Sequence, residues 1–106
     1  MSMKDPSNGD GQHGRLWFEW DPRKAAENAR RHRVTFDEAE TAFADPHSMD
    51  MYDPDHSTNE DRYIKLGMSN ARRLLIVVYT DRKSRIRLIS ARKANRQERR
   101  RYEEGN

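Results

Sequence analysis

The sequence contains no cysteine, and only 33% of its 106 residues are hydrophobic. The lack of cysteine excludes a disulfide framework, a thiolate metal site and a cysteine nucleophile. The longest apolar run spans residues 74–78, far short of the roughly 20 residues that a membrane-spanning helix needs. The N-terminal residues lack the apolar segment of a secretory signal, so we expect a cytoplasmic protein with no membrane partner.

Charged residues make up 37% of the chain, and 21 Lys and Arg against 18 Asp and Glu give a net charge of +3. A chain of this length forms one domain with a small core. Residues 1–15 hold glycine, proline and polar residues without a periodic apolar position, which predicts a disordered N-terminal tail. The single folded domain is expected over residues 16–106.

Local patterns predict an α+β fold. An aromatic strand is expected at 16–20, and Asp21 before Pro22 starts a helix over 22–32 whose packing face consists of alanines. Thr35 and Glu38 form a capping-box pattern for a second helix over 36–44. Strands are then expected at 48–52, 62–66, 73–80 and 85–91, and a basic helix at 95–103. The order β-α-α-β-β-β-β-α places two helices before an antiparallel meander.

The modest net charge conceals a strong separation of charge along the chain. Residues 35–61 contain nine acidic residues and no Lys or Arg, whereas residues 82–101 contain ten basic residues and one acid, a net charge of 10 − 1 = +9. Eight of those ten are arginine, whose planar fork suits phosphate oxygens. The pattern favours a nucleic-acid partner, although the same charges could simply be a solvated surface that neutralises the acidic segment.

Two groups of polar residues suggest phosphodiester chemistry. Lys24, Asn28 and His32 recur every four residues and form one stripe on the first helix, which either binds a phosphodiester or is a plain solvent-facing surface. In the last strand, simple alternation places Arg87 and Arg92 on opposite faces unless a bulge intervenes. Both can then contact one phosphate only if the strand bends.

The acidic and aromatic candidates each have two interpretations. Glu60 is either a general base or a salt-bridge partner of Arg62 or Lys65, and Glu98 is either an acid or the cap of the last helix after Asn95. Tyr79 and Tyr102 could stack on bases, although Tyr79 lies in an apolar strand and is more typical of a core. His47, Asp53, Asp55 and His56 are a weak metal signal because their spacing is irregular, and we expect neither a metal nor another cofactor.

Several motifs together resemble the BrnT toxin family. The most specific is the run from Arg87 to Ala94, followed at fixed offsets by Glu98 and Tyr102, and the next is Phe18-Glu19-Trp20-Asp21. Further matches are Lys24-Ala25 with Asn28, His32 before the run 34–39, Asp45-Pro46, Asp55-His56-Ser57, Glu60-Asp61-Arg62, Gly67 and the run 77–80. The resemblance covers residues 17–103. One departure is Arg33, where the family usually has glycine, so we expect the first helix to end differently here.

This resemblance implies the toxin of a type II toxin-antitoxin system with a RelE-like fold. Such a toxin is an endoribonuclease that cleaves RNA, inhibits translation and arrests growth. The implied partner is a BrnA-like antitoxin, which neutralises the toxin and whose DNA-binding domain represses the operon with the toxin as co-repressor. The alternative is a non-catalytic module that binds nucleic acid or docks to its antitoxin in transcriptional autoregulation.

A metal-independent ribonuclease needs a base for the RNA 2′-hydroxyl, cations for the phosphorane and an acid for the leaving oxygen. We expect Arg87 and Arg92 to hold the phosphate, Arg62 to assist, Lys24 and His32 to supply charge and protons, and Glu60 or Glu98 to act as base. Further RNA contacts are expected from Asn28, Arg85, Lys93, Arg96 and Tyr102.

Overall fold

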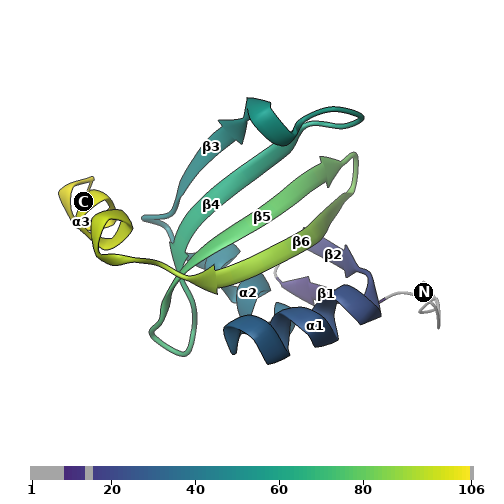
Figure 1. Ribbon diagram of the computed structural model, residues 1–106, viewed down its shortest axis with the longest axis horizontal. Coiled ribbons are helices and arrows are strands. Elements are labelled where there is room, and N and C mark those ends of the chain that lie inside the picture. Colours follow the sequence, from purple (N-terminus) through teal and green to yellow (C-terminus); the bar gives the residue numbers. More distant parts are fainter. Residues whose placement is uncertain (1–8, 14–15, 106) are drawn as a thin grey trace.

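A computed structural model describes residues 9–13 and 16–105. Over these residues the chain forms one six-stranded sheet with three α-helices (Figure 1). The strand order across the sheet is β1-β2-β6-β5-β4-β3, and every pairing except the parallel pair of β2 with β6 is antiparallel. The predicted α+β class, with two helices ahead of an antiparallel meander, is confirmed.

The elements follow the predicted order closely. The strands are β1 Gly9–His13, β2 Leu16–Trp20, β3 Met49–Asp53, β4 Arg62–Met68, β5 Leu74–Arg82 and β6 Arg85–Lys93. The helices are α1 Pro22–His32, α2 Phe36–Thr41 and α3 Arg96–Glu104, with 3-10 turns at Ala42–Ala44 and Pro54–His56. The capping residues Asp21, Thr35 and Asn95 all accept the expected backbone N–H bonds.

Strand β1 lies inside the segment 1–15, where the sequence predicted disorder. It pairs with β2 at one edge of the sheet, so backbone hydrogen bonds hold it. Its glycine and polar residues give no alternating hydrophobic pattern from which a strand could be predicted. A strand therefore lies where the sequence predicted a disordered tail, and residues 1–8 and 14–15 lie outside the described residues.

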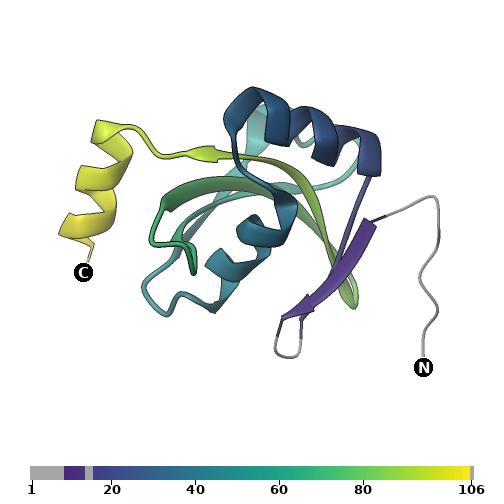
Figure 2. The same ribbon diagram turned by 90° about the horizontal axis from the view of Figure 1, so that it is seen from below.

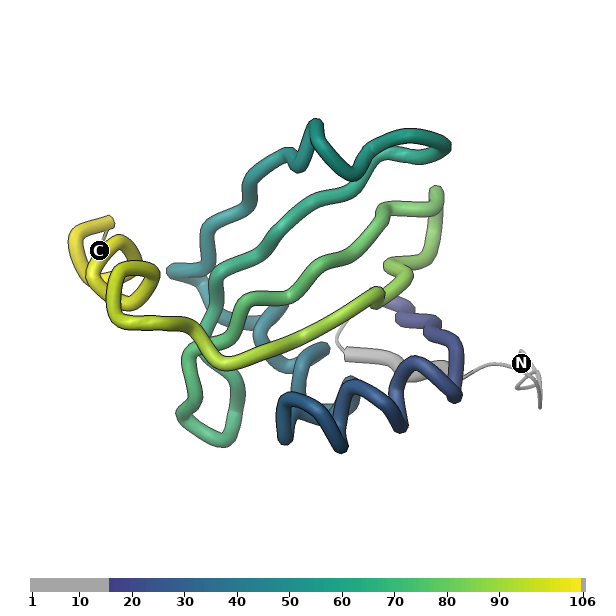
Figure 3. Tube along the Cα trace, viewed as in Figure 1, coloured from purple at the N-terminus to yellow at the C-terminus, as the bar shows by residue number. Residues whose placement is uncertain are grey.

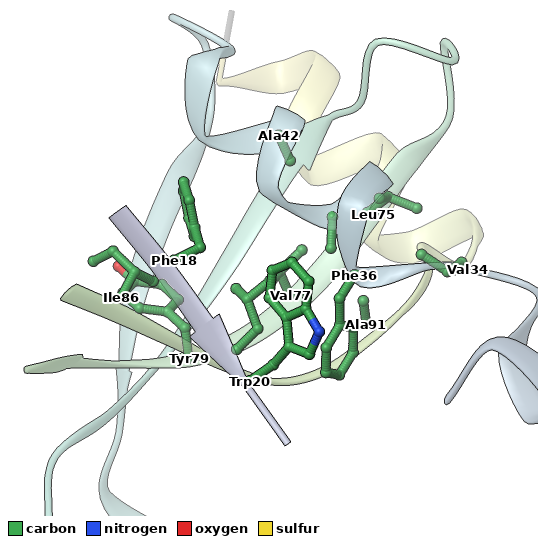
Figure 4. Close-up of a cluster of buried hydrophobic side chains, with 12 residues drawn as sticks. Phe18, Trp20, Val34, Phe36, Ala42, Leu75, Val77, Tyr79, Ile86 and Ala91 are labelled. Carbon is green, nitrogen blue, oxygen red and sulfur yellow. The ribbon is translucent and has the colours of Figure 1, made fainter. Parts of the chain in front are cut away.

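One face of the sheet carries the main core, and we call it the covered face. Alternate residues of β2, β5 and β6 point there and pack against α2, with Phe18 and Leu75 completely buried (Figure 4). The cluster contains Phe18, Trp20, Val34, Phe36, Ala39, Ala42, Leu75, Val77, Tyr79, Ile86, Leu88 and Ala91. Strand β5 is buried on both faces, as its continuous apolar run predicted.

The opposite face is called the open face, and α3 covers only one end of it. There Leu66, Leu74 and Ile76 form a second, smaller cluster against which Tyr102 of α3 packs. Figure 2 shows α3 standing at the end of the sheet away from β1, clear of α1 and α2. The rest of the open face, toward the β5–β6 turn, is therefore not covered by a helix of the described chain. Within the described residues, no helix has the length and apolar content needed to cross a membrane.

Helix α1 ends in a left-handed residue although that residue is arginine. Arg33 has φ 60° and ψ 31°, and its N–H donates to the carbonyl of Ala29. The expectation of a different helix end is therefore wrong. The carbonyl of Arg33 accepts a hydrogen bond from the guanidinium of Arg73, the residue just before β5, and this guanidinium also pairs with Glu38 of α2. These contacts stabilise a backbone conformation that glycine would adopt at lower cost.

Candidate active site

Strand β6 contains a bulge that decides which side chains share a face. Val78 of β5 pairs with Ser90, but the next residue, Tyr79, pairs with Leu88, so Ile89 has no partner on β5. The extra residue reverses the alternation: Leu88 before the bulge and Ala91 after it are both buried in the core. Arg87 and Arg92 therefore both lie on the open face, which simple alternation forbids.

Residues of four strands line up across the open face at the level of Arg87. In the strand register Arg62 of β4 pairs with Thr80 of β5, Thr80 pairs with Arg87 of β6, and Arg87 pairs with Glu19 of β2. Arg87 makes an ion pair with Glu19 at 3.5 Å, whereas Arg62 has no ion-pair partner among the described residues. The Thr80 hydroxyl is buried between the two arginines without a hydrogen-bond partner in the described chain. Two guanidinium groups and a hydroxyl thus face the position an anion would take.

A cleft of about 310 Å³ lies next to this row. Its floor consists of apolar residues of the central strands, and its polar groups come from β6, β4, the end of β3 and the 3-10 turn Pro54–His56. The lining residues are Asp53, His56, Arg62, Ile64, Ile76, Val78, Ile89, Ser90 and Arg92. Three of the predicted cationic side chains, Arg62, Arg87 and Arg92, are therefore gathered on one face. Figure 3 traces the backbone of the central strands that carry them.

His56 and Asp53 form a hydrogen-bonded pair at the rim of this cleft. The His56 Nδ1 lies 2.9 Å from the Asp53 Oδ2, which leaves Nε2 directed away from that carboxylate. Ser57 ties the turn to β4, because its hydroxyl donates to the Asp53 carbonyl and accepts from the Arg62 N–H. The sequence predicted Asp53 and His56 as part of a weak metal signal, and Asp55-His56-Ser57 as one motif of the family resemblance. Their spacing of three residues across Pro54 is the feature that indicates a carboxylate-oriented imidazole.

A second cleft, of about 230 Å³, separates α1 from β6. Lys24, Glu27, Asn28, Arg31 and His32 line one wall, and Ile89 and Ser90 of the bulge line the other. The bulge residues line both clefts, so Lys24 and His32 lie across β6 from Arg62 and Arg92. The predicted stripe on α1 faces a cleft; it is not a plain solvent-facing surface.

Asn28 is buried, and its amide is bonded within the fold. Its side chain is 6% exposed, donates to the carbonyls of Val34 and Ala91 and accepts from the Ala91 N–H. It is the buried residue of α1, where the alanines were expected to form the packing face. Asn28 is buried because β2 pairs with β6 only as far as Arg87. Beyond that point the edge of β6 has no neighbouring strand in the described part of the chain, so the Ala91 peptide needs another hydrogen-bond partner.

Both glutamates proposed as the general base are bound to arginines. Glu98 receives two hydrogen bonds of 2.9 Å from Arg92, and Glu60 receives two from Arg82. These guanidinium groups lower the pKa of each carboxyl below its usual value. A carboxylate with a lowered pKa is a weaker base, so Glu98 is placed to orient Arg92 and Glu60 to orient Arg82.

The other predicted RNA contacts do not all reach the clefts. Tyr102 donates to Asp45 over 2.6 Å, and burial together with this bond raises its pKa to about 12, so it fastens α3 to the body. Lys93 directly follows Arg92 in the chain and is exposed. Arg96 is exposed on α3. Arg85 lies two residues before Arg87 in β6. Within the described residues, no three His, Asp or Glu side chains are grouped to hold a metal ion.

Comparisons with known proteins identify a family and a related fold. A family model described as the ribonuclease toxin BrnT of type II toxin-antitoxin systems matches residues 20–98. A search of curated proteins finds no match.

The fold is similar to that of the Brucella abortus ribonuclease toxin BrnT, whose crystal structure was determined at 1.1 Å. The TM-score is 0.53 and the sequence identity 24%, over 73% of this chain and 94% of that one. At this identity the likeness concerns the fold.

Proposed function

Because the chain belongs to the BrnT family of ribonuclease toxins of type II toxin-antitoxin systems, we propose that it is a metal-independent endoribonuclease whose active site is the open face of the sheet. The observation that carries the proposal is the bulge at Ile89, which brings Arg87 and Arg92 to the face that holds Arg62. Family membership implies an antitoxin partner and an RNA target. A BrnA-like antitoxin that binds operator DNA in complex with this chain, and inhibition of translation in the cytoplasm, belong to the same proposal.

The arginines supply the electrostatic part of the reaction. When the RNA 2′-oxygen attacks the adjacent phosphorus, negative charge grows on the phosphorane oxygens. Arg62, Arg87 and Arg92 are positioned to stabilise that charge, and guanidinium forks match a phosphate with two parallel hydrogen bonds. Cations of the protein can therefore take the part that a metal ion plays in other nucleases.

Proton transfer is assigned to the two histidines that line the clefts. His56, held at Nδ1 by Asp53, accepts the proton of the 2′-hydroxyl at Nε2, the ring nitrogen that this contact leaves unused. His32, across β6 and beside Lys24, gives a proton to the 5′-oxygen as the P–O bond breaks. The products are a 2′,3′-cyclic phosphate and a 5′-hydroxyl. Glu60 and Glu98 act as positioning residues in this scheme.

The proposal predicts turnover without metal. The purified chain, free of antitoxin, is incubated in EDTA with a labelled RNA, and the product ends are mapped. We expect product in excess of enzyme, ending in 2′,3′-cyclic phosphate and 5′-hydroxyl. Salt-dependent binding without product would contradict the ribonuclease assignment and favour the non-catalytic module. Ribosomes added to the same reaction show whether cleavage requires them.

Replacing His56 tests the assigned base. We expect His56→Gln to lower kcat by roughly 100-fold or more with little change in KM, since a positioned base contributes about 10²–10⁴-fold. Asp53→Asn, which leaves the imidazole in place but not oriented, is expected to have a smaller effect.

His47 provides the matched control because it is exposed in the loop before β3 and lines neither cleft. His47→Gln should cleave like the wild type. If His56→Gln also retains wild-type kcat, the base has been misassigned.

A further inference from the structure

Trp17 lies on the open face beyond the arginine row. It is 38% exposed, one of the few large hydrophobic side chains at the described surface that reach this level. Phe18 and Trp20 on either side of Glu19 point into the core, so alternation places Trp17 and Glu19 together on the opposite face. The ion pairs of Glu19 with Arg82 and Arg87 confirm that this is the open face.

Arg85 is the neighbour of Trp17 across the strand pair. In the parallel register Trp17 pairs with Arg85 and Glu19 pairs with Arg87. The Trp17–Arg85 pair therefore lies two residues before the Glu19–Arg87 pair, on the same face of both strands. Successive residues of one face lie about 7 Å apart along a strand. Arg87 and Arg82 are held by carboxylates, whereas Arg85 has no ion-pair partner among the described residues. An exposed indole thus stands beside an uncompensated guanidinium, next to the proposed phosphate site.

We propose that Trp17 and Arg85 form a nucleotide subsite, in which the indole stacks on a base adjacent to the cleaved bond and Arg85 binds that nucleotide's phosphate. The inference rests on the proposed function and specifies its substrate class as unpaired RNA. A base can stack on a protein aromatic group only when it is free of its own helix, because paired bases are stacked on each other. The subsite therefore selects single-stranded segments and is indifferent to which base occupies it.

Binding of an uncleavable ligand tests the subsite separately from catalysis. The probe is a single-stranded oligoribonucleotide with 2′-O-methyl groups, which lack the nucleophile, compared with the same strand annealed to its complement. We expect the single strand to quench tryptophan emission and bind the wild type more tightly than the duplex does. Trp17→Ala should weaken binding of the single strand about ten-fold, within the range known for stacking on one base.

Two further variants and the kinetics complete the experiment. Trp17→Phe keeps a ring and should retain most of the affinity, while Leu16→Ala, which removes the neighbouring exposed side chain, should bind like the wild type. In cleavage assays Trp17→Ala should raise KM about ten-fold and leave kcat nearly unchanged, since the stacking is present before and during the reaction.

The outcomes separate this inference from the proposed function. Wild-type cleavage combined with unaltered binding by Trp17→Ala, or with equal affinity for duplex and single strand, would overturn the subsite alone. If the wild type neither binds nor cleaves RNA, with or without ribosomes, the proposed function fails and the subsite fails with it. A KM effect in Trp17→Ala that Trp17→Phe restores supports both.

Discussion

Arg92→Ala is expected to lower kcat of RNA cleavage by about 10²–10³-fold, the usual cost of removing one preorganised donor from a charge-stabilising site. Arg92 lines the open-face cleft, and Glu98 holds both of its terminal nitrogens at 2.9 Å. Its guanidinium is therefore in place before RNA binds and needs no reorganisation during the reaction. Single-turnover kinetics with saturating enzyme measure this loss apart from any loss of RNA affinity.

The charge and the geometry of Arg92 can be separated. Arg92→Lys keeps the charge but loses the fork that Glu98 orients, so we expect it to restore only a small part of the activity. Glu98→Gln keeps the capping-box position while weakening the hold on Arg92, and should lower kcat about ten-fold with little change in KM. Arg30→Ala removes one exposed positive charge from α1 outside both clefts and should cleave like the wild type. Equal losses for Arg30→Ala and Arg92→Ala would mean that only the overall charge matters.

The Arg92–Glu98 ion pair also changes the stability of the fold with pH, which can be measured without a cleavage assay. Arg92 lowers the pKa of Glu98 in the folded chain, so the pair stabilises the fold above the usual pKa of 4.5 and loses that contribution as the pH falls through the lowered value. Arg92→Ala should accordingly be less stable than the wild type at pH 7 and should approach it in acid. This readout shows whether the pair forms in solution even where no activity is measured.

Local sequence signals were sufficient for the elements of this fold. Capping residues and prolines placed the helices, and apolar runs placed the strands, because these features act within a few residues. Helix α1 spans 22–32 as predicted, and the helix predicted over 36–44 is α2 followed by a 3-10 turn. Strand β1 could not be predicted because its partner strand, not its own composition, holds it in place.

The site was predictable only in its composition. The sequence identified Arg62, Arg87 and Arg92 as candidates, but a bulge depends on how two strands pair, and nothing in residues 85–93 alone places it at Ile89. The pairing of His56 with Asp53 likewise depends on the turn that follows β3. The roles given to Glu60 and Glu98 changed because their partners, Arg82 and Arg92, are fixed by tertiary contacts.

Asn28 shows how a polar residue on a helix can belong to the core. Helix α1 has alanines but no large apolar residue to bury, and asparagine is unfavourable in a helix interior unless its side chain has a specific partner. An amide carries a donor and an acceptor, so it can replace a neighbouring strand for one peptide. Here it satisfies both the N–H and the carbonyl of Ala91, 63 residues away.

We expect Asn28→Ala to reduce the free energy of unfolding by about 3–5 kcal/mol, because each buried backbone group left without a partner costs about 1–3 kcal/mol. The substitution removes bonds to the Ala91 N–H, the Ala91 carbonyl and the Val34 carbonyl. A chain of this size has a total stability of roughly 5–15 kcal/mol, so the melting temperature should fall by about 12 °C or more. Denaturant and thermal unfolding measure both quantities.

Asn28→Asp distinguishes lost hydrogen bonds from lost packing because its shape is the same. The carboxylate still accepts from the Ala91 N–H but faces two carbonyl oxygens without a proton to donate, so it should be nearly as unstable as the alanine variant at pH 7. Protonation gives it one donor, and a carboxyl of this kind has a raised pKa in the folded state; its stability should therefore recover as the pH falls. Asn59→Asp, exposed in the loop before β4, should show no such recovery.

The same variants decide between the two roles considered for Asn28. A residue that contacts RNA can be replaced with little loss of stability, and its replacement raises KM. If Asn28 instead bonds the edge of β6, its replacement lowers stability first. Activity then falls with the folded fraction, because α1 is no longer hydrogen-bonded to β6 beside the bulge at Ile89. A stable Asn28→Ala variant with a raised KM would return Asn28 to the RNA-binding surface. Parallel loss of fold and activity, reversed by cooling, would place it in the scaffold that holds the two clefts together.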